Sequence, residues 1–131
     1  MVLEFGNPDT LKASTRFAHV VKASGGSTVY VSGQVSVDGE GRLVGEGNLE
    51  AQSIQAFGNV GRALASVGAS WDDVARMTIY VVDFEPSKYG AMQAGREAAL
   101  GSTLPASTLL GVQALADPSY LIEVEAIAVL D

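Results

Sequence analysis

The sequence has no cysteine and only a single histidine, His19. Disulfide bonds and thiolate nucleophiles are therefore excluded, and so is a metal site that needs several cysteine or histidine ligands. A glycine-rich phosphate loop followed by a lysine is also missing, although the chain contains 15 glycines. We therefore expect no metal and no bound cofactor. The lack of cysteine fits a cytoplasmic location.

Positive charge is scarce, and long hydrophobic runs are missing. Eight Lys and Arg residues stand against fifteen Asp and Glu residues, which gives a net charge of −7. Nucleic-acid binding depends on clustered cations, and the cations of this chain are scattered, so the sequence argues against nucleic acid as a partner. No apolar run approaches the ~18 residues that span a bilayer, and the start of the chain lacks the pattern of a signal peptide. A membrane partner is therefore not expected either.

The chain does contain enough apolar residues for one hydrophobic core. Its 131 residues, 47% hydrophobic and 18% charged, predict a single domain over residues 1–131. Between residues 48 and 67, apolar side chains recur every three or four positions, which predicts a helix with Asn48 as N-cap and Gly68 just beyond its end. A second helix is expected over residues 86–101. Met92 and Arg96 share one side of it, and Arg96 is interpreted as a solvated neighbour of the apolar positions.

Segments that favour β-strands flank both predicted helices. The first two strands are separated by the residues Ser-Gly-Gly-Ser, which favour a hairpin turn between them. The third strand is apolar and is expected to be buried on both faces of a sheet. The predicted strands cover residues 17–23, 28–32, 77–82, 107–115 and 120–130. This order predicts an α+β fold, in which a mixed sheet carries two helices on one face.

Two carboxylates are expected on one face of the last strand. The alternation of side chains along a strand puts Glu123 and Glu125 on the same side, about 7 Å apart. On a buried face, one of them could accept a proton from a water molecule. The pair could equally be structural, with each glutamate neutralised by an arginine.

Two features near the first strands also have two interpretations. His19 could carry a proton in a pocket, but a lone histidine at such a position is more often structural. The glycine in Ser32-Gly33-Gln34 would let a ligand or a neighbouring backbone come close, although a β-bulge is the more frequent reason for such a glycine.

Four short segments together resemble one known family. They are VYVSGQ at residues 29–34, EAQ at 50–52, LPA at 104–106 and IEVEAIA at 122–128. In this order, and over about residues 17–129, they resemble the Rid family, also called the YjgF or L-PSP endoribonuclease family. The resemblance implies a chorismate-mutase-like fold that assembles as a homotrimer with clefts between adjacent subunits. Members with a complete cleft deaminate 2-imino acids to 2-oxo acids and ammonia.

The resemblance also implies a cleft in which some residues are kept and others differ. Glu123 would handle the attacking water, and Gly33 is retained. Ser107 stands where complete members carry an arginine that grips the substrate carboxylate, and a neutral hydroxyl cannot form that pair of charge-assisted hydrogen bonds. Arg16 or His19 could supply a substitute positive charge. The other candidate cleft residues are Ser32 of the SGQ segment, Phe17 in place of a tyrosine and Gln93 in place of an asparagine.

Three functions follow from these residues. The first is a Rid-like homotrimer whose cleft binds or hydrolyses a small metabolite other than a simple 2-imino acid, because Ser107 favours a ligand without a free carboxylate. The second is 2-iminobutanoate/2-iminopropanoate deamination in spite of Ser107. The third is a non-enzymatic protein that binds a metabolite or acts through its surface. An acidic chain gives no support to ribonuclease activity.

Overall fold

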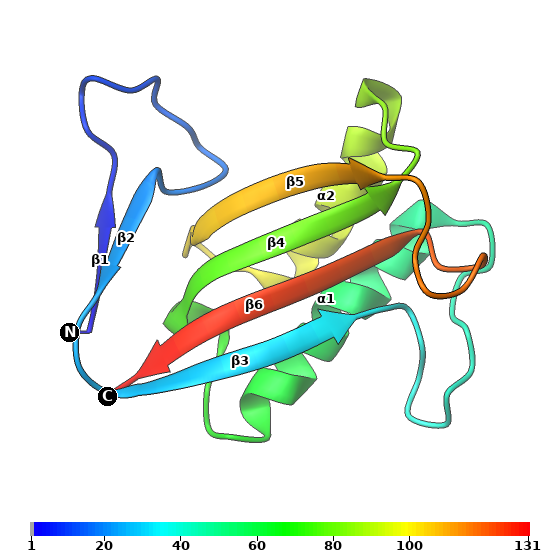
Figure 1. The fold of residues 1–131 in the computed structure, drawn as a ribbon, viewed down its shortest axis with the longest axis horizontal. Helices are drawn as coiled ribbons and strands as arrows, with labels where there is room; N and C mark the ends of the chain where they lie inside the picture. Colours follow the sequence, from blue (N-terminus) through cyan, green and yellow to red (C-terminus); the bar gives the residue numbers. More distant parts are fainter. Residues whose placement is uncertain (1) are drawn as a thin grey trace.

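A mixed four-stranded sheet forms the centre of the structure, a computed structural model that describes residues 2–131. Its strands are β3 (Ser27–Gln34), β4 (Val74–Val82), β5 (Ala106–Val112) and β6 (Ile122–Leu130), in the order β3-β6-β4-β5. Strands β4 and β5 are parallel, and β6 is antiparallel to both β3 and β4. Helices α1 (Leu49–Ala65) and α2 (Tyr89–Ala99) lie on one face of this sheet (Figure 1). The predicted α+β arrangement is confirmed.

The amino-terminal strands form a second, two-stranded sheet that stands beside the main one (Figure 1). Strand β1 (Leu3–Gly6) pairs with β2 (Val20–Ala23), whereas β3 pairs with β6. The predicted hairpin between residues 17–23 and 28–32 is therefore wrong. Gly25 and Gly26 do adopt positive φ values of 63° and 70°, as a tight turn requires, but this turn leads from one sheet into the other.

Helix α1 begins and ends where its capping residues predict. The Asn48 side chain accepts a hydrogen bond from the Ala51 N–H at 3.0 Å, which satisfies one of the free amide groups of the first turn. Just beyond the helix, Gly68 has a φ of 79°, in the left-handed region that glycine tolerates. Phe57 and Leu64 are completely buried between the helix and the sheet. The helix predicted from apolar spacing is confirmed.

Two short 3₁₀ helices flank β4. The first, η1 (Trp71–Asp73), opens with a reciprocal capping box between Ser70 and Asp73. The second, η2 (Pro86–Lys88), starts the predicted second helix at its proline and leads directly into α2. Among residues 2–131, none of the helices combines the length and the apolar character that crossing a membrane demands.

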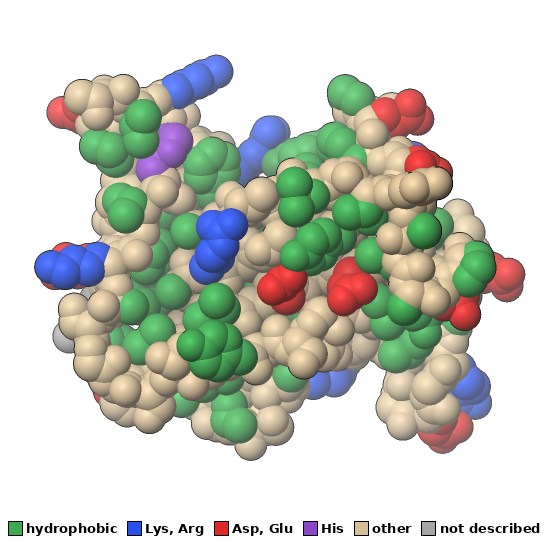
Figure 2. All heavy atoms as spheres, in the orientation of Figure 1, with side chains coloured by type: hydrophobic (Ala, Val, Ile, Leu, Met, Phe, Trp, Pro, Cys, Tyr) green, Lys and Arg blue, Asp and Glu red, His purple; other side chains and the backbone are tan. Residues whose placement is uncertain are grey.

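The two faces of the main sheet differ in what covers them. On β4, Met77, Ile79 and Val81 are buried under the helices, whereas the alternate residues are exposed or half-buried. The prediction that this strand is buried on both faces is therefore wrong for the single chain. On β6, Glu123 and Glu125 share the face away from the helices, as strand alternation predicts. Figure 2 shows acidic side chains among hydrophobic ones on this open face.

Helices α1 and α2 are in close contact at Gly95 of α2. The Ser53 hydroxyl on α1 donates a hydrogen bond of 2.6 Å to the carbonyl oxygen of Met92 on α2. A Cβ atom on Gly95 would collide with the Ser53 hydroxyl and with the Ser53 backbone. Because backbone meets backbone here, the crossing at Gly95 fixes where α2 lies and how its next residue, Arg96, is directed.

Candidate functional site

The carboxylate of Glu123 lies directly over Gly33. The pairing register between β3 and β6 shifts between Val31 and Gln34, which indicates a β-bulge around the SGQ segment. A Cβ atom on Gly33 would collide with Oε2 of Glu123 and would come within 2.7 Å of its Cδ. The glycine therefore serves a bulge and also leaves room for a carboxylate side chain.

No other group in the described chain neutralises Glu123. It is half-buried, and within residues 2–131 its carboxylate makes no hydrogen bond and no ion pair. The ion pairs in that range join Arg42 to Asp38 and to Glu40, so the alternative in which arginines neutralise both glutamates is wrong for the single chain. The Glu123 oxygens are free to accept a hydrogen bond from water or from a ligand.

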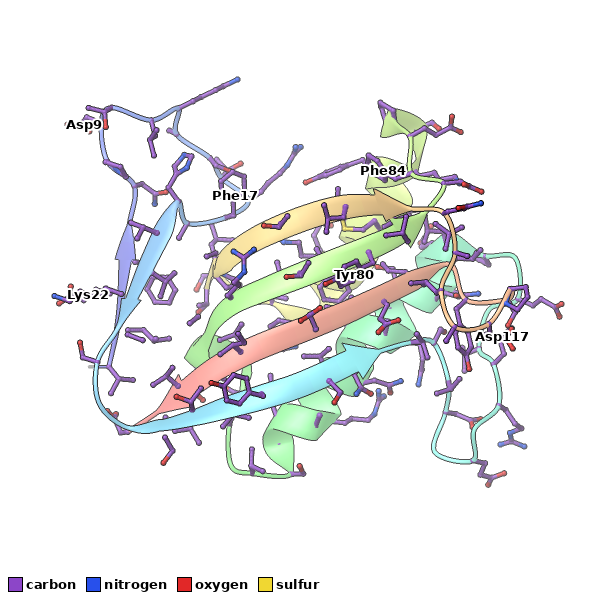
Figure 3. The ribbon with its side chains drawn as sticks, viewed as in Figure 1. Asp9, Phe17, Lys22, Tyr80, Phe84 and Asp117 are labelled. Atoms are coloured by element: carbon purple, nitrogen blue, oxygen red, sulfur yellow. The ribbon has the colours of Figure 1, made fainter. Side chains whose placement is uncertain are left out.

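Glu125, two residues further along β6, has a different role. It accepts a 2.5 Å hydrogen bond from the Tyr80 hydroxyl of β4, in the middle of the sheet (Figure 3). This hydrogen bond raises the pKa of Tyr80 above its usual value, and burial and the negative charges of Glu125 and Glu123 add to the rise. Glu125 is thus occupied by a structural contact, whereas Glu123 is not.

The raised pKa of Tyr80 predicts a loss of stability at alkaline pH. Between the usual tyrosine pKa, about 10, and the raised value, the folded protein keeps a proton that the unfolded chain has lost. The stabilisation from the Tyr80–Glu125 hydrogen bond is therefore complete below about pH 10 and is lost above it. Urea unfolding of the parent and of Tyr80→Phe should show a stability difference that shrinks as the pH rises. If the stability difference between the parent and Tyr80→Phe stays constant with pH, the Tyr80–Glu125 hydrogen bond does not raise the pKa of Tyr80.

A small pocket lies on the helix-covered side of the sheet, between α2 and the edge strand β5. Its volume is about 130 Å³, and both Phe17 and Ser107 line it. The segment around Phe17 is held there by a 3.3 Å hydrogen bond from the Ala18 N–H to the Pro105 carbonyl oxygen, just before β5. Figure 3 shows Phe17 near the start of that strand. The pocket therefore brings together two of the predicted cleft residues.

Arg96 also lines this pocket, and it is buried. Only 6% of the residue is exposed, so its interpretation as a solvated neighbour is wrong. The side chain lies between this pocket and a second one of about 200 Å³. Its Nη2 atom is buried and has no hydrogen-bond partner within residues 2–131. Burial lowers the pKa of the Arg96 guanidinium below its usual value, and the positive charge of Arg16 also lowers it.

Arg16 and His19, the two predicted sources of a substitute positive charge, both line one surface hollow. Arg16 lines the pocket with Ser107, and its guanidinium carbon lies 4.7 Å from the centre of the Tyr89 ring, a cation–π contact. His19 lines the hollow but not this pocket. Its ring meets Phe17 edge to face, with centroids 5.2 Å apart, and its Nε2 is 2.6 Å from the Lys12 carbonyl oxygen. Arg16 is therefore the better placed of the two.

The predicted site residues do not form one cavity within a single chain. Glu123 and the exposed Ser32 belong to the open face of the sheet, whereas Ser107 lies on its helix-covered side. Gln93 lines the second pocket together with Arg96, and its Oε1 is buried without a partner within residues 2–131. In that same range, no three His, Asp or Glu side chains gather closely enough to hold a metal ion.

This architecture, with both helices on one face of a mixed sheet, defines the class of α+β proteins with a chorismate-mutase-like fold. Within that class, the family model described as Endoribonuclease L-PSP matches residues 8–130. The chain therefore belongs to the endoribonuclease L-PSP family, also called the Rid family.

Individual relatives show how similar the chain is to other members. A 2-iminobutanoate/2-iminopropanoate deaminase of Mus musculus is 34% identical over 103 residues, which cover 78% of this chain and 73% of the relative. A RutC family protein of Pyrococcus abyssi is 30% identical over 103 residues, 79% of each chain. Among solved structures, the Rid-family protein YyfB of Yersinia pestis superposes with a TM-score of 0.92 at 38% identity. That alignment covers 99% of this chain and 100% of YyfB.

The pocket contains one important residue that sequence reasoning did not select. Arg96 lies four residues after Met92 and four before Leu100, and both of these are buried. An arginine between two core positions of the same helical face points inward rather than into solvent. This spacing is the signal in the sequence that identifies Arg96 as a buried charge.

Proposed function

We propose that the protein is a cytoplasmic, homotrimeric hydrolase of the Rid family. It acts on a C–N bond of a small metabolite other than a simple 2-imino acid, and residues 1–131 work as one domain. The observation that carries this proposal is the Glu123 carboxylate, which lies over Gly33 on the open sheet face and has no partner within residues 2–131. A carboxylate held in this way can accept a proton from water.

The reaction needs only water and residues of this chain. Glu123 takes a proton from a water molecule while the water oxygen attacks the carbon of a C=N bond. Glu123 passes this proton to the nitrogen, and a tetrahedral intermediate with one hydroxyl and one amino group on the carbon forms. Glu123 then takes the proton of that hydroxyl and gives it to the amino group, so the C–N bond breaks, ammonia leaves and the carbon becomes a carbonyl. One water is consumed for each ammonia released.

The separation of the site residues supports an assembly of several copies. Within one chain, Glu123 lies on the open face and Ser107 on the helix-covered side, so a ligand that contacts both needs a second subunit. The open face also carries large exposed side chains, with Tyr30 at 78% and Leu110 at 42% exposure. Such a face is suited to burial against another copy of the chain. In a closed trimer, every subunit would bury its open face against a neighbour.

The assembly can be checked by mass. Light scattering at micromolar concentration should give three times the 13.5 kDa of one chain. Tyr30→Glu, which adds a charge to the exposed sheet face, should lower that mass. Glu40→Gln, which changes the charge of an exposed loop, should leave it unchanged. A monomer mass for the parent would contradict the proposed trimer.

The proposal that simple 2-imino acids are poor substrates can be tested directly. The parent should clear 2-iminobutanoate, generated in place, more slowly than the mouse relative, which is named a deaminase of this substrate. Ser107→Arg should raise the rate by about ten- to a hundredfold, because a charged hydrogen bond contributes about 1.5–3 kcal/mol. Ser107→Ala serves as the matched control and should bring no gain.

The same assay distinguishes the alternative functions. Clearance of 2-iminobutanoate by the parent at the rate of the mouse relative would support ordinary deamination and remove the argument from Ser107. If the parent hydrolyses no imine, enamine or amide in a broad panel, the enzymatic proposal fails. A metabolite-binding role without catalysis would then remain.

A further inference from the structure

We propose that Arg96 is the anion-binding residue of this chain, and that together with Arg16 it binds the carboxylate of a small apolar acid between α2 and β5. The inference deepens the proposed function, because it names the class of substrate or product for the same cleft. It replaces the expectation of a ligand without a free carboxylate, which was drawn from Ser107.

The first reason is that the charge of Arg96 lacks a partner. The residue is 6% exposed, and its Nη2 makes no hydrogen bond within residues 2–131. No carboxylate in that range forms an ion pair with it. Buried charges in proteins are normally paired, because removing an ion from water is costly unless a counter-charge replaces the water. A bound anion would supply the missing partner.

The second reason is that another arginine faces the same pocket. Arg16 is held by stacking on Tyr89, 4.7 Å from the ring centre, and is not paired with an acid within residues 2–131. The pKa of Arg96 is lowered mainly by burial, and the repulsion between the charges of Arg16 and Arg96 adds to this effect. Two like charges that line one pocket are unfavourable. They become favourable when an anion lies between them, because a guanidinium matches a carboxylate with two parallel hydrogen bonds.

The walls of the pocket limit the size and the polarity of the group that is attached to the bound carboxylate. The volume of about 130 Å³ corresponds to roughly four water molecules at about 30 Å³ each. Most of the remaining wall is apolar and is formed by Phe17, Ile79, Met92 and Leu109. A short alkyl chain would bury apolar surface there, whereas further polar groups would lose their hydrogen bonds to water. The pocket is therefore suited to a short aliphatic carboxylate.

The position of Arg96 also explains why the ligand differs from a simple 2-imino acid. An arginine at position 107 would extend from β5, whereas Arg96 extends from α2 on the opposite wall of the pocket. A ligand whose carboxylate binds to Arg96 is therefore oriented differently from a ligand whose carboxylate binds to an arginine at position 107. Ser107 lines the same pocket and offers its hydroxyl as one further donor.

Butyrate and butyramide form a pair of probes that differ only in charge. Isothermal titration of the parent should show that butyrate binds at least about tenfold more tightly than butyramide. Arg96→Gln should abolish this preference, and Arg96→Lys should keep part of it, because lysine retains the charge but not the planar fork. Arg16→Gln, at an exposed residue, should reduce the preference a few-fold without endangering the fold. Arg62→Gln, an exposed arginine on α1 outside this pocket, is the matched control and should change nothing.

Several results would overturn the inference. These are equal binding of butyrate and butyramide by the parent, an unchanged preference in Arg96→Gln, or an equal loss in Arg62→Gln. If Arg96→Gln lowers the oligomer mass while butyrate still binds, Arg96 pairs with a carboxylate of another subunit instead. If Arg96→Gln does not fold, the test uses Arg16→Gln. A preference for butyrate over butyramide that is unchanged in Arg16→Gln then overturns the inference. Binding through Arg96 without any C–N hydrolysis would contradict the proposed function but not this inference.

Discussion

Glu123→Gln is expected to lower the rate of C–N hydrolysis by about 10²- to 10⁴-fold, the usual contribution of a positioned general base. The amide has the shape of the carboxylate but cannot accept the proton of the attacking water. Because Glu123 has no hydrogen-bond or ion-pair partner within residues 2–131, its replacement should leave the free energy of unfolding almost unchanged. The decisive measurement is ammonia release from a substrate found in the panel described above.

Two further variants separate the role of Glu123 from that of its surroundings. Glu125→Gln is the matched control on the same strand face, and it should affect stability through Tyr80 more than the rate. Gly33→Ala keeps the carboxylate but displaces it, since the new Cβ would collide with Oε2 of Glu123. The rate should therefore fall in Gly33→Ala as well. A rate that is lowered in Glu125→Gln but not in Glu123→Gln would assign the base to the other glutamate.

The parts of the fold that could be predicted are those set by local patterns. Helix α1 follows from apolar spacing and from the capping groups at Asn48 and Gly68, all of which lie within one segment. Which residues of β6 lie on which face of the sheet follows from the alternation of side chains along the strand. Strand pairing is different, because it depends on segments far apart in the chain. The Gly25-Gly26 turn indicated a hairpin, but the edge of β3 pairs with β6, about a hundred residues later.

The candidate site was predictable to a similar extent. The resemblance selected Glu123 and Gly33, and the structure brings these two into contact. It could not reveal that Arg96 reaches the pocket of Ser107, because that proximity depends on how α2 packs against β5. The spacing of apolar residues along a helix identifies which side of the helix is buried. It does not identify the strand or helix that packs against that side. Only the tertiary structure therefore shows that Arg96 and Ser107 line the same pocket.

This link between helix packing and the site leads to the second large effect, which concerns Gly95. Gly95→Ala should destabilise the fold by about 3 kcal/mol, at the upper end of the usual cost of overpacking. The added Cβ would collide with the hydroxyl and the backbone of Ser53, and a backbone cannot move aside as a flexible side chain can. Helix α2 would have to move away from α1, and the 2.6 Å hydrogen bond from Ser53 to Met92 would be broken.

Gly90→Ala is the matched control for this prediction, because Gly90 lies in the same helix and a Cβ there would meet nothing within 4 Å. Replacing glycine by alanine in an open helical position should stabilise the protein by up to about 1 kcal/mol. The two variants should therefore shift the urea midpoint in opposite directions at an unchanged slope. Since α2 carries Arg96, a folded Gly95→Ala protein should also bind butyrate more weakly than Gly90→Ala does. Equal midpoints for the two variants would mean that the crossing at Gly95 is not what holds α2, and with it the Arg96 guanidinium, in place.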